Sequence, residues 1–203
     1  MFTYHTITHL TDGLLPEWLV LYETAFPAHE RVLVAGFLKH LRRIEAGDPV
    51  SAEMLAAVDR ERRLAGMAFY EHVPDLRLMF LWYMAVDGER RSQGLGSQLY
   101  QEVVHRARRA GCRALLFEVE RPAVCSTSET QALAERRIQF YRRNGAQLLQ
   151  GVDYLQSVGP HQPATPMHLM LHPFEPLTSG DAFALAKAAF DDALCQVAEL
   201  RLV

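Results

Sequence analysis

The sequence lacks three features that would identify a class of protein: paired cysteines, a long apolar run and a large net charge. Its three cysteines, Cys112, Cys125 and Cys195, form no Cys-x-x-Cys pair, which argues against a disulfide framework and against a structural zinc site. No apolar run approaches the roughly 18 residues of a membrane helix, so we expect no membrane partner. The formal net charge of -3 argues against nucleic acid as a partner.

The N-terminal residues MFTYHTITHL also lack the basic stretch and following apolar stretch of a secretory signal. Because the cysteine pattern suits a reducing compartment, we expect a cytoplasmic protein. The 203 residues, 49% of them hydrophobic and 22% charged, suit one globular domain with an added element.

The stretch 81–120 carries the clearest structural signal. An apolar run that ends near Val86 is followed by a glycine-containing turn, a helical pattern and a second apolar run after Gly111. This order predicts a strand, a loop, a helix and a second strand. Four apolar residues of the helical pattern share one stripe: Leu95, Leu99, Val103 and Ala107. That stripe predicts that one face of the helix packs on a sheet.

Two glycines, Gly94 and Gly96, lie where this helix is about to begin. They leave successive backbone N–H groups unobstructed at the positive end of the helix dipole, which is a favourable place for a phosphate group. The pattern Arg91-x-x-Gly94-x-Gly96 is shorter than the dinucleotide fingerprint and lacks the Lys-Ser/Thr ending of a P-loop. For these six residues alone, a strand-to-helix turn without a ligand is the alternative.

A second motif ends a helical stretch that begins near Glu129, with the sequence FYRRNGA over residues 140–146. Together the two motifs resemble the GCN5-related N-acetyltransferase (GNAT) superfamily, whose pyrophosphate loop has Arg or Gln, two residues, Gly, one residue, and Gly or Ala. The helix end is similar to the superfamily's "LYEKLGF". The resemblance spans about residues 1–174, with specific motifs between 76 and 146. The chain departs from it at Ala134 and Arg137, where members often carry Asn and Ala.

The resemblance implies an α/β fold of the acyl-CoA N-acyltransferase type, with a central mixed, mostly antiparallel sheet flanked by helices. Residues 1–174 would form the acetyltransferase domain, and residues 175–203 an extra C-terminal amphipathic helix, packed on the domain or at a homodimer interface. The patterns predict strands at 2–10, 51–58, 64–73, 76–86, 146–156 and 167–173, and helices at 16–26, 31–46, 129–144 and 179–200.

The resemblance also implies acetyl-CoA as cosubstrate and an amine as acceptor, and it assigns roles to individual positions. The backbone of Met84, Ala85 and Val86 would hold the pantetheine and polarise the thioester carbonyl. Tyr141 would protonate the departing thiolate. The pyrophosphate would be held by Arg91, Ser92, Gln93, Gly94, Leu95, Gly96 and Ser97.

The general base is the least defined role, because the strand 76–86 contains no carboxylate. Glu118 and Glu120 share one face of the strand after the helix by period-two geometry. Glu30 lies between the first two helices. A carboxylate in a cleft can act through water, although a salt-bridged structural residue is the alternative for each of the three.

Two histidines, His168 and His172, have a spacing that would suit a metal site on a helix. Their surroundings predict a strand, where a spacing of four residues separates them by about 13 Å. We therefore expect no metal site.

The first hypothesis is an acetyl-CoA-dependent N-acetyltransferase that acts on a primary amine of a small molecule or peptide by direct attack in a ternary complex. The second is a noncatalytic acyl-CoA-binding regulatory module of the same fold. The presence of Tyr141 favours the enzyme. The departures at Ala134 and Arg137, and the lack of an obvious base, keep the second hypothesis open.

Overall fold

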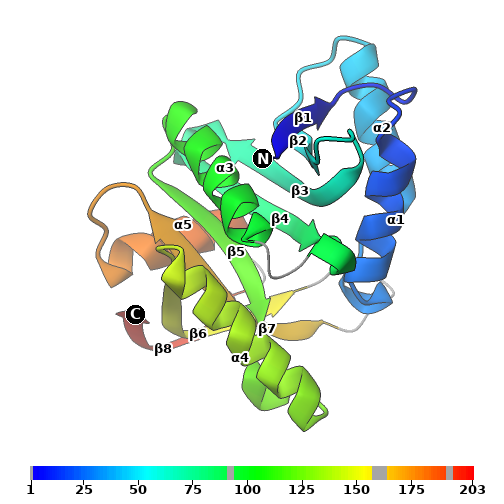
Figure 1. Cartoon of the computed structure of the whole chain (residues 1–203). Coiled ribbons are helices and arrows are strands. Elements are labelled where there is room, and N and C mark those ends of the chain that lie inside the picture. The colour runs from blue at the N-terminus through cyan, green and yellow to red at the C-terminus, as the bar shows by residue number, and fades with distance from the viewer. Residues whose placement is uncertain (1, 91–93, 157–163, 191–193) are drawn as a thin grey trace. The chain divides into compact units, whose positions relative to one another are not determined.

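The computed structural model describes residues 2–90, 94–156, 164–190 and 194–203 (Figure 1). These residues form a mixed α/β fold. In chain order the elements are β1 (Thr3–Ile7), α1 (Leu15–Ala25), α2 (Val34–Glu45), β2 (Ala52–Val58), β3 (Leu64–Val73), β4 (Leu78–Val86), α3 (Leu95–Arg109), β5 (Ala114–Glu120), α4 (Ser128–Arg143), β6 (Gln147–Gln156), β7 (Thr165–Pro173), α5 (Ser179–Phe190) and β8 (Leu194–Leu202). Strand β2 pairs antiparallel with β1 and β3, and β5, β6, β7 and β8 pair antiparallel in the order β5-β7-β6-β8. No helix among the described residues is both long and apolar enough to cross a bilayer.

The chain divides into two compact units. The N-terminal unit comprises Met1–His72 and Leu81–Val103, and the C-terminal unit comprises Val73–Phe80 and Val104–Val203. Strand β4 and helix α3 therefore each contribute residues to both units. Each unit has its own layered core.

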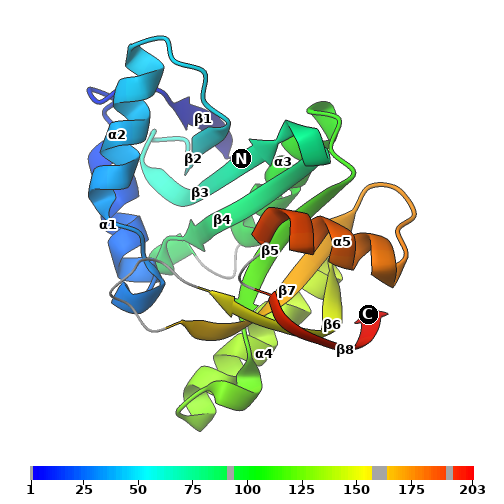
Figure 2. The same ribbon diagram turned by 180° about the vertical axis from the view of Figure 1, so that it is seen from behind.

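In the N-terminal unit, helices α1 and α2 lie side by side against the strands in order β1-β2-β3-β4 (Figures 1 and 2). Met54 and Ala56 of β2 face these two helices and pack with Trp18 and Phe37. Period-two alternation turns the intervening residues of β2 to the other face, where Leu99 of α3 packs. The sheet is thus covered by helices on both faces.

In the C-terminal unit, the strands run in the order β5-β7-β6-β8. Helix α4 covers one face through the contact of Tyr141 with Phe117, whose ring centroids are 4.4 Å apart. Helix α5 covers the other face, where Ala182 and Ala186 are fully buried against the strands. Figure 2 shows α5 in front of these strands and Figure 1 shows α4 in front of them.

Most predicted elements are confirmed, including their local stop and start signals. Pro16 lies in the first turn of α1. Thr127 caps α4 in a capping box with Thr130, and Gly145, with φ 98°, ends that helix in the left-handed conformation. The buried stripe of α3 is also as predicted, with Leu95, Leu99, Val103 and Ala107 at most 1% exposed.

The predicted helix at 179–200 is wrong in its second half, because α5 ends at Phe190 and Leu194–Leu202 form strand β8. Strand β8 pairs antiparallel with β6, with Leu149 opposite Leu202 and Val152 opposite Val197. The apolar spacing that suggested a longer helix is also compatible with a strand over its last residues. Pairing with β6 satisfies backbone groups at an edge that a helix would leave unpaired, and this tertiary effect decides the structure.

Candidate cofactor loop and catalytic residues

The first candidate region is the end of β4, in the N-terminal unit. Met84, Ala85 and Val86 are half-buried there. Two side chains fix the strand just before them. The indole N–H of Trp82 donates to the carboxylate of Glu71 at 3.2 Å, and the ring of Tyr83 packs against that of Phe37.

Gly66 explains how the neighbouring strand accommodates this backbone. A Cβ atom at Gly66 would lie 3.1 Å from the carbonyl oxygen of Ala85 and 3.2 Å from Cδ2 of Leu99. Both distances are shorter than ordinary van der Waals contacts, so a side chain would push α3 or β4 away. The close packing at Gly66 therefore lies beside the predicted pantetheine strand.

The second candidate region is the start of α3, also in the N-terminal unit. Arg91, Ser92 and Gln93 lie outside the described residues. Gly94 is exposed and has φ 75°, a conformation that favours glycine. Its carbonyl accepts the first helical bond, from the N–H of Gln98 at 3.1 Å.

The geometry of this helix start suits a phosphate group. Leu95, Gly96 and Ser97 form the first turn of α3, whose N–H groups have no acceptor within the helix. Leu95 is buried, whereas Gly96 and Ser97 are partly exposed. The described part of the loop therefore presents backbone donors and the positive end of the helix dipole to an anion.

The backbone carbonyl of Glu30 is hydrogen-bonded to a side chain near the end of β4. The hydroxyl of Tyr83 donates to the carbonyl oxygen of Glu30 at 2.9 Å and accepts from the N–H of Val32 at 3.2 Å. The Glu30 side chain is 12% exposed, and its carboxylate lies 3.6 Å from Nε2 of His29. The backbone next to this candidate base is therefore hydrogen-bonded to Tyr83, the residue directly before the candidate pantetheine segment of β4.

Tyr141 belongs to the C-terminal unit and is 7% exposed. Its ring packs against Phe117 of β5 and against Phe140. Burial raises the pKa of Tyr141 to about 12; the positive charge of Arg137 opposes this rise and the negative charge of Glu120 adds to it. The phenol is therefore neutral at pH 7 and carries a proton that it can donate.

Glu118 and Glu120 have different partners in the C-terminal unit, although they are two residues apart in β5. The carboxylate of Glu120 forms an ion pair with Arg137 of α4. The carboxylate of Glu118 accepts hydrogen bonds from the hydroxyl of Tyr154 and from the amide of Gln156. The departure at Arg137 is thus explained by its pairing with one of the candidate bases.

The predicted residues are only partly brought together by these contacts. Tyr141, Arg137 and Glu120 form one electrostatic cluster in the C-terminal unit. Sequence reasoning missed Tyr83 and Tyr154, which hold the backbone of Glu30 and the carboxylate of Glu118. Both tyrosines are buried, and a buried phenol usually finds a hydrogen-bond partner, so the residue type was the available signal.

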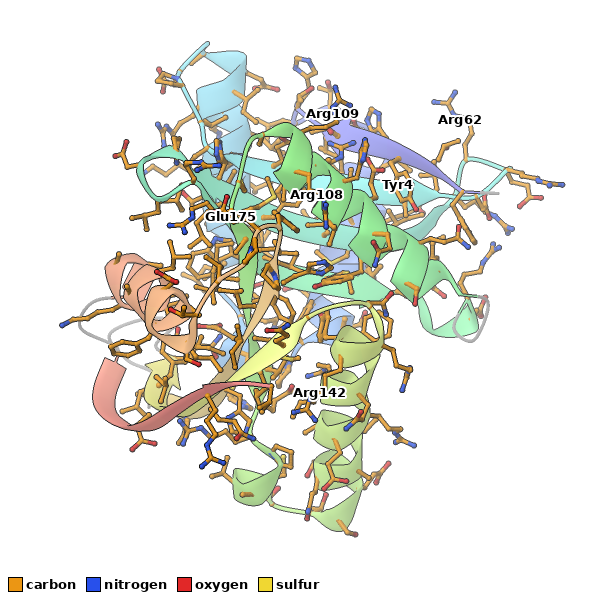
Figure 3. The ribbon with its side chains drawn as sticks, turned by 90° about the vertical axis from the view of Figure 1, so that its left-hand side faces the viewer. Tyr4, Arg62, Arg108, Arg109, Arg142 and Glu175 are labelled. Carbon is orange, nitrogen blue, oxygen red and sulfur yellow. The ribbon has the colours of Figure 1, made fainter. Side chains whose placement is uncertain are left out.

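The arginines of α4 also differ from one another in their surroundings. Arg137 is paired, whereas Arg143 is exposed. Arg142 is partly buried, and its Nε atom has no hydrogen-bond partner among the described residues. Figure 3 shows its side chain on α4.

His168 and His172, whose spacing would suit a metal site on a helix, lie in strand β7, as predicted. Burial lowers the pKa of His172 to about 4, with a smaller effect from the charge of Arg108. Burial, and then Arg121, lower the pKa of His168. The described residues contain no group of three or more His, Cys, Asp or Glu side chains able to hold a metal ion.

Comparison with known proteins decides the family. The model of the acetyltransferase (GNAT) family matches residues 15–146, a range that includes the helix start of α3, both acids of β5 and Tyr141. The chain belongs to the GNAT acetyltransferase family. Membership supports acyl-CoA-dependent acetyltransferase activity as the general function. No curated protein sequence matches the chain.

Solved structures of the GNAT fold are similar to this chain over most of its length. A GNAT-family protein from Bacteroides thetaiotaomicron has a TM-score of 0.73 at 21% identity, covering 92% of this chain and 94% of that one. A Bacillus subtilis acetyltransferase in complex with CoA has a TM-score of 0.55 at 13% identity, with coverage of 86% and 100%. A GNAT acetyltransferase from Elizabethkingia anophelis with acetyl-CoA bound has a TM-score of 0.55 at 15% identity, with coverage of 85% and 98%. At these identities the likeness concerns the fold.

Proposed function

We propose that the protein is an N-acetyltransferase that transfers the acetyl group of acetyl-CoA to a primary amine of a small molecule or peptide. The amine attacks the thioester directly in a ternary complex. The observation that carries this proposal is the extent of the family match, because residues 15–146 include both the glycine loop and Tyr141. The bound CoA and acetyl-CoA of the two structural relatives support the choice of cosubstrate.

The cosubstrate is held by backbone groups of the N-terminal unit. The N–H groups at the start of α3, with the loop from Arg91 to Ser97, bind the pyrophosphate. The exposed backbone of Gly94 and its φ of 75° support this role, because no side chain there obstructs a phosphate. The backbone of Met84, Ala85 and Val86 holds the pantetheine and polarises the thioester carbonyl, which develops negative charge as the amine attacks.

Proton transfers are assigned to side chains. Tyr141 protonates the thiolate that leaves when the tetrahedral intermediate collapses, and its raised pKa keeps the phenol protonated until then. A carboxylate accepts a proton from the acceptor's ammonium group, directly or through water, so that the neutral amine attacks the thioester. Glu30, Glu118 and Glu120 remain the three candidates, since each has a partner that also fits a structural role.

The experiment that tests this function is an acceptor screen with acetyl-CoA. Free thiol is measured for a panel of small amines and peptides, with hydrolysis of acetyl-CoA alone as the reference. An N-acetyltransferase gives amine-dependent thiol release and an acetylated product by mass spectrometry. Thiol release that never exceeds hydrolysis, together with intact acetyl-CoA binding, would instead identify the noncatalytic acyl-CoA-binding module.

The same screen separates the candidate bases. Once an acceptor is known, the variants Glu30→Gln, Glu118→Gln and Glu120→Gln remove one carboxylate each and keep the shape of the side chain. The general base is the position whose variant lowers kcat by about 100-fold, the usual size of a positioned acid–base group, and removes the acidic limb of the pH–rate profile.

A further inference from the structure

A buried carboxylate, Asp59, lies in the turn between β2 and β3 of the N-terminal unit and is only 7% exposed. Its Oδ1 atom accepts hydrogen bonds from the N–H groups of Glu61 at 2.9 Å and of Arg63 at 3.0 Å. The side chain therefore caps the turn, as aspartates in tight turns commonly do. Arg62, with φ 63°, lies in the same turn, and Figure 3 shows its exposed side chain there.

The other carboxylate oxygen of Asp59 has a separate use. Oδ2 lies 2.6 Å from a guanidinium nitrogen of Arg90 and 3.2 Å from one of Arg63. The Arg63 side chain is 61% exposed, whereas that of Arg90 is 25% exposed. Because solvent screens the exposed partner more strongly, the pair with Arg90 is the stronger of the two.

Arg90 comes directly before the loop that begins at Arg91. It ends a short 3-10 turn, Gly88–Arg90, that follows β4. The start of this segment is fixed by Asp87, whose N–H donates to the carbonyl of Ala65 at 3.0 Å and whose carboxylate caps the N–H of Glu89 at 2.8 Å. The end of the segment is fixed by the side chain of Arg90 on Asp59.

We propose that Asp59 is a positioning residue for acetyl-CoA binding: by holding the guanidinium of Arg90 against the β2–β3 turn, it fixes the chain that leads into the phosphate loop. This inference rests on the proposed function, since it requires that the loop bind acetyl-CoA. In this role Asp59 acts through Arg90 and not on the cosubstrate itself. A preorganised loop binds more tightly because less conformational entropy is lost on binding.

Simple electrostatics predicts the opposite effect of removing this charge. The group of Asp59, Arg63 and Arg90 carries one negative and two positive charges. Replacing Asp59 by Asn raises the local net charge by one, which by Coulomb attraction alone would strengthen the binding of a pyrophosphate. If Asp59 acts by positioning, the same replacement weakens binding, so the sign of the change distinguishes the two effects.

The test measures acetyl-CoA affinity by calorimetry and turnover with an accepted amine for the full-length protein. Asn at position 59 retains an oxygen that can cap the turn but loses the ion pair with Arg90. We expect Asp59→Asn to weaken acetyl-CoA binding about tenfold, with kcat at saturating acetyl-CoA within about twofold of wild type. Arg62→Gln is the matched control, because it removes one charge of the same turn without touching the pair, and its affinity should stay within about twofold.

A double-mutant cycle adds a measurement that a general loss of stability would not mimic. Arg90→Ala should weaken binding about as much as Asp59→Asn, and the double variant should be no weaker than either single one. Arg90→Lys, which keeps a positive charge for Asp59, should restore most of the affinity. If Asp59→Asn does not fold, Arg90→Ala and Arg90→Lys still decide, because they leave the cap of the turn intact.

The outcomes separate this inference from the proposed function. Unchanged or tighter binding by a folded Asp59→Asn, or additive effects in the cycle, would overturn the positioning role while leaving the function in place. A wild-type protein that does not bind acetyl-CoA would overturn both. Weaker binding that is non-additive and relieved by Arg90→Lys supports the role.

Discussion

The two units of the chain hold their candidate functional groups in different ways. In the N-terminal unit the groups proposed to bind acetyl-CoA are backbone atoms at the end of β4 and at the start of α3, and Glu30 is the candidate base of that unit. In the C-terminal unit they are side chains on the faces of elements, with Tyr141 on α4 and Glu118 and Glu120 on β5. Changes at the backbone sites of the first unit should therefore alter cosubstrate affinity, and changes to Tyr141 and to the base should alter turnover.

The largest expected effect that tests this difference between the units is the loss of turnover when the hydroxyl of Tyr141 is removed. Tyr141→Phe keeps the ring against Phe117 and removes the proton, so we expect kcat to fall about 100-fold with acetyl-CoA affinity nearly unchanged. The matched control is Tyr70→Phe, which removes another buried hydroxyl, one that donates to Glu53 at 2.8 Å. Steady-state kinetics, calorimetry and melting temperature are measured on both variants. Full turnover by a folded Tyr141→Phe would end the general-acid assignment.

The reverse pattern is expected in the N-terminal unit. Gly96→Glu places a side chain and a negative charge at the helix start, so acetyl-CoA affinity should fall by at least about tenfold, or 1.4 kcal/mol. Gly36→Glu is the control, because Gly36 lies in α2 and a Cβ there meets nothing within 4 Å. Calorimetry on the two variants, with their circular dichroism, makes the comparison. Wild-type affinity in Gly96→Glu would remove the loop from the binding site.

A stability prediction concerns α5, which belongs wholly to the C-terminal unit. Ala186 is fully buried against the strands, so Ala186→Glu buries an unpaired charge and should destabilise the protein by at least about 2 kcal/mol. Lys187→Glu, at an exposed neighbouring position, should change little. Urea unfolding measures both. An equal, small effect of the two changes would mean that α5 does not contribute to this core, and sedimentation would then test the alternative of a dimer contact.

The effect that is smallest at neutral pH is a pH dependence that belongs to the C-terminal unit. The pKa of His172 is about 4 in the folded protein, against about 6.5 in an unfolded chain. The unfolded state therefore binds the extra proton first as pH falls, so this group lowers stability progressively from about pH 6.5 to pH 4 and costs nothing above that window. His172→Gln should flatten the dependence of melting temperature on pH in this window, with His105→Gln, an exposed position on α3, as control. An unchanged profile would contradict the assignment.

The contrast between the units also explains what the sequence could predict. Gly94 and Gly145 are glycines that the backbone requires, at φ 75° and 98°, and the apolar stripe of α3 has a fixed period. Such local requirements can be recognised in the sequence, and they predicted the start of α3, the end of α4 and most strands correctly.

Which side chains pair with one another cannot be recognised in the sequence in the same way. Glu118 and Glu120 look equivalent along β5, yet Arg137 pairs with one and Tyr154 and Gln156 with the other. An aspartate at position 59 is ordinary for a turn, and nothing near it in sequence indicates Arg90. Strand β8 was missed for the same reason, since its pairing with β6 depends on backbone groups about 50 residues earlier in the chain.

The position of each unit along the sequence determines which parts can fold first during translation. A ribosome releases the N-terminus first, and domains generally fold as units during translation. All of the N-terminal unit lies within the first 103 residues, so the start of α3 can form before Tyr141 has been made. Strand β6 must wait longest, because its partner β8 lies among the last ten residues. Until β8 has been synthesised, β6 presents an unpaired edge to other nascent chains, and a chain truncated before β8 would keep that edge exposed.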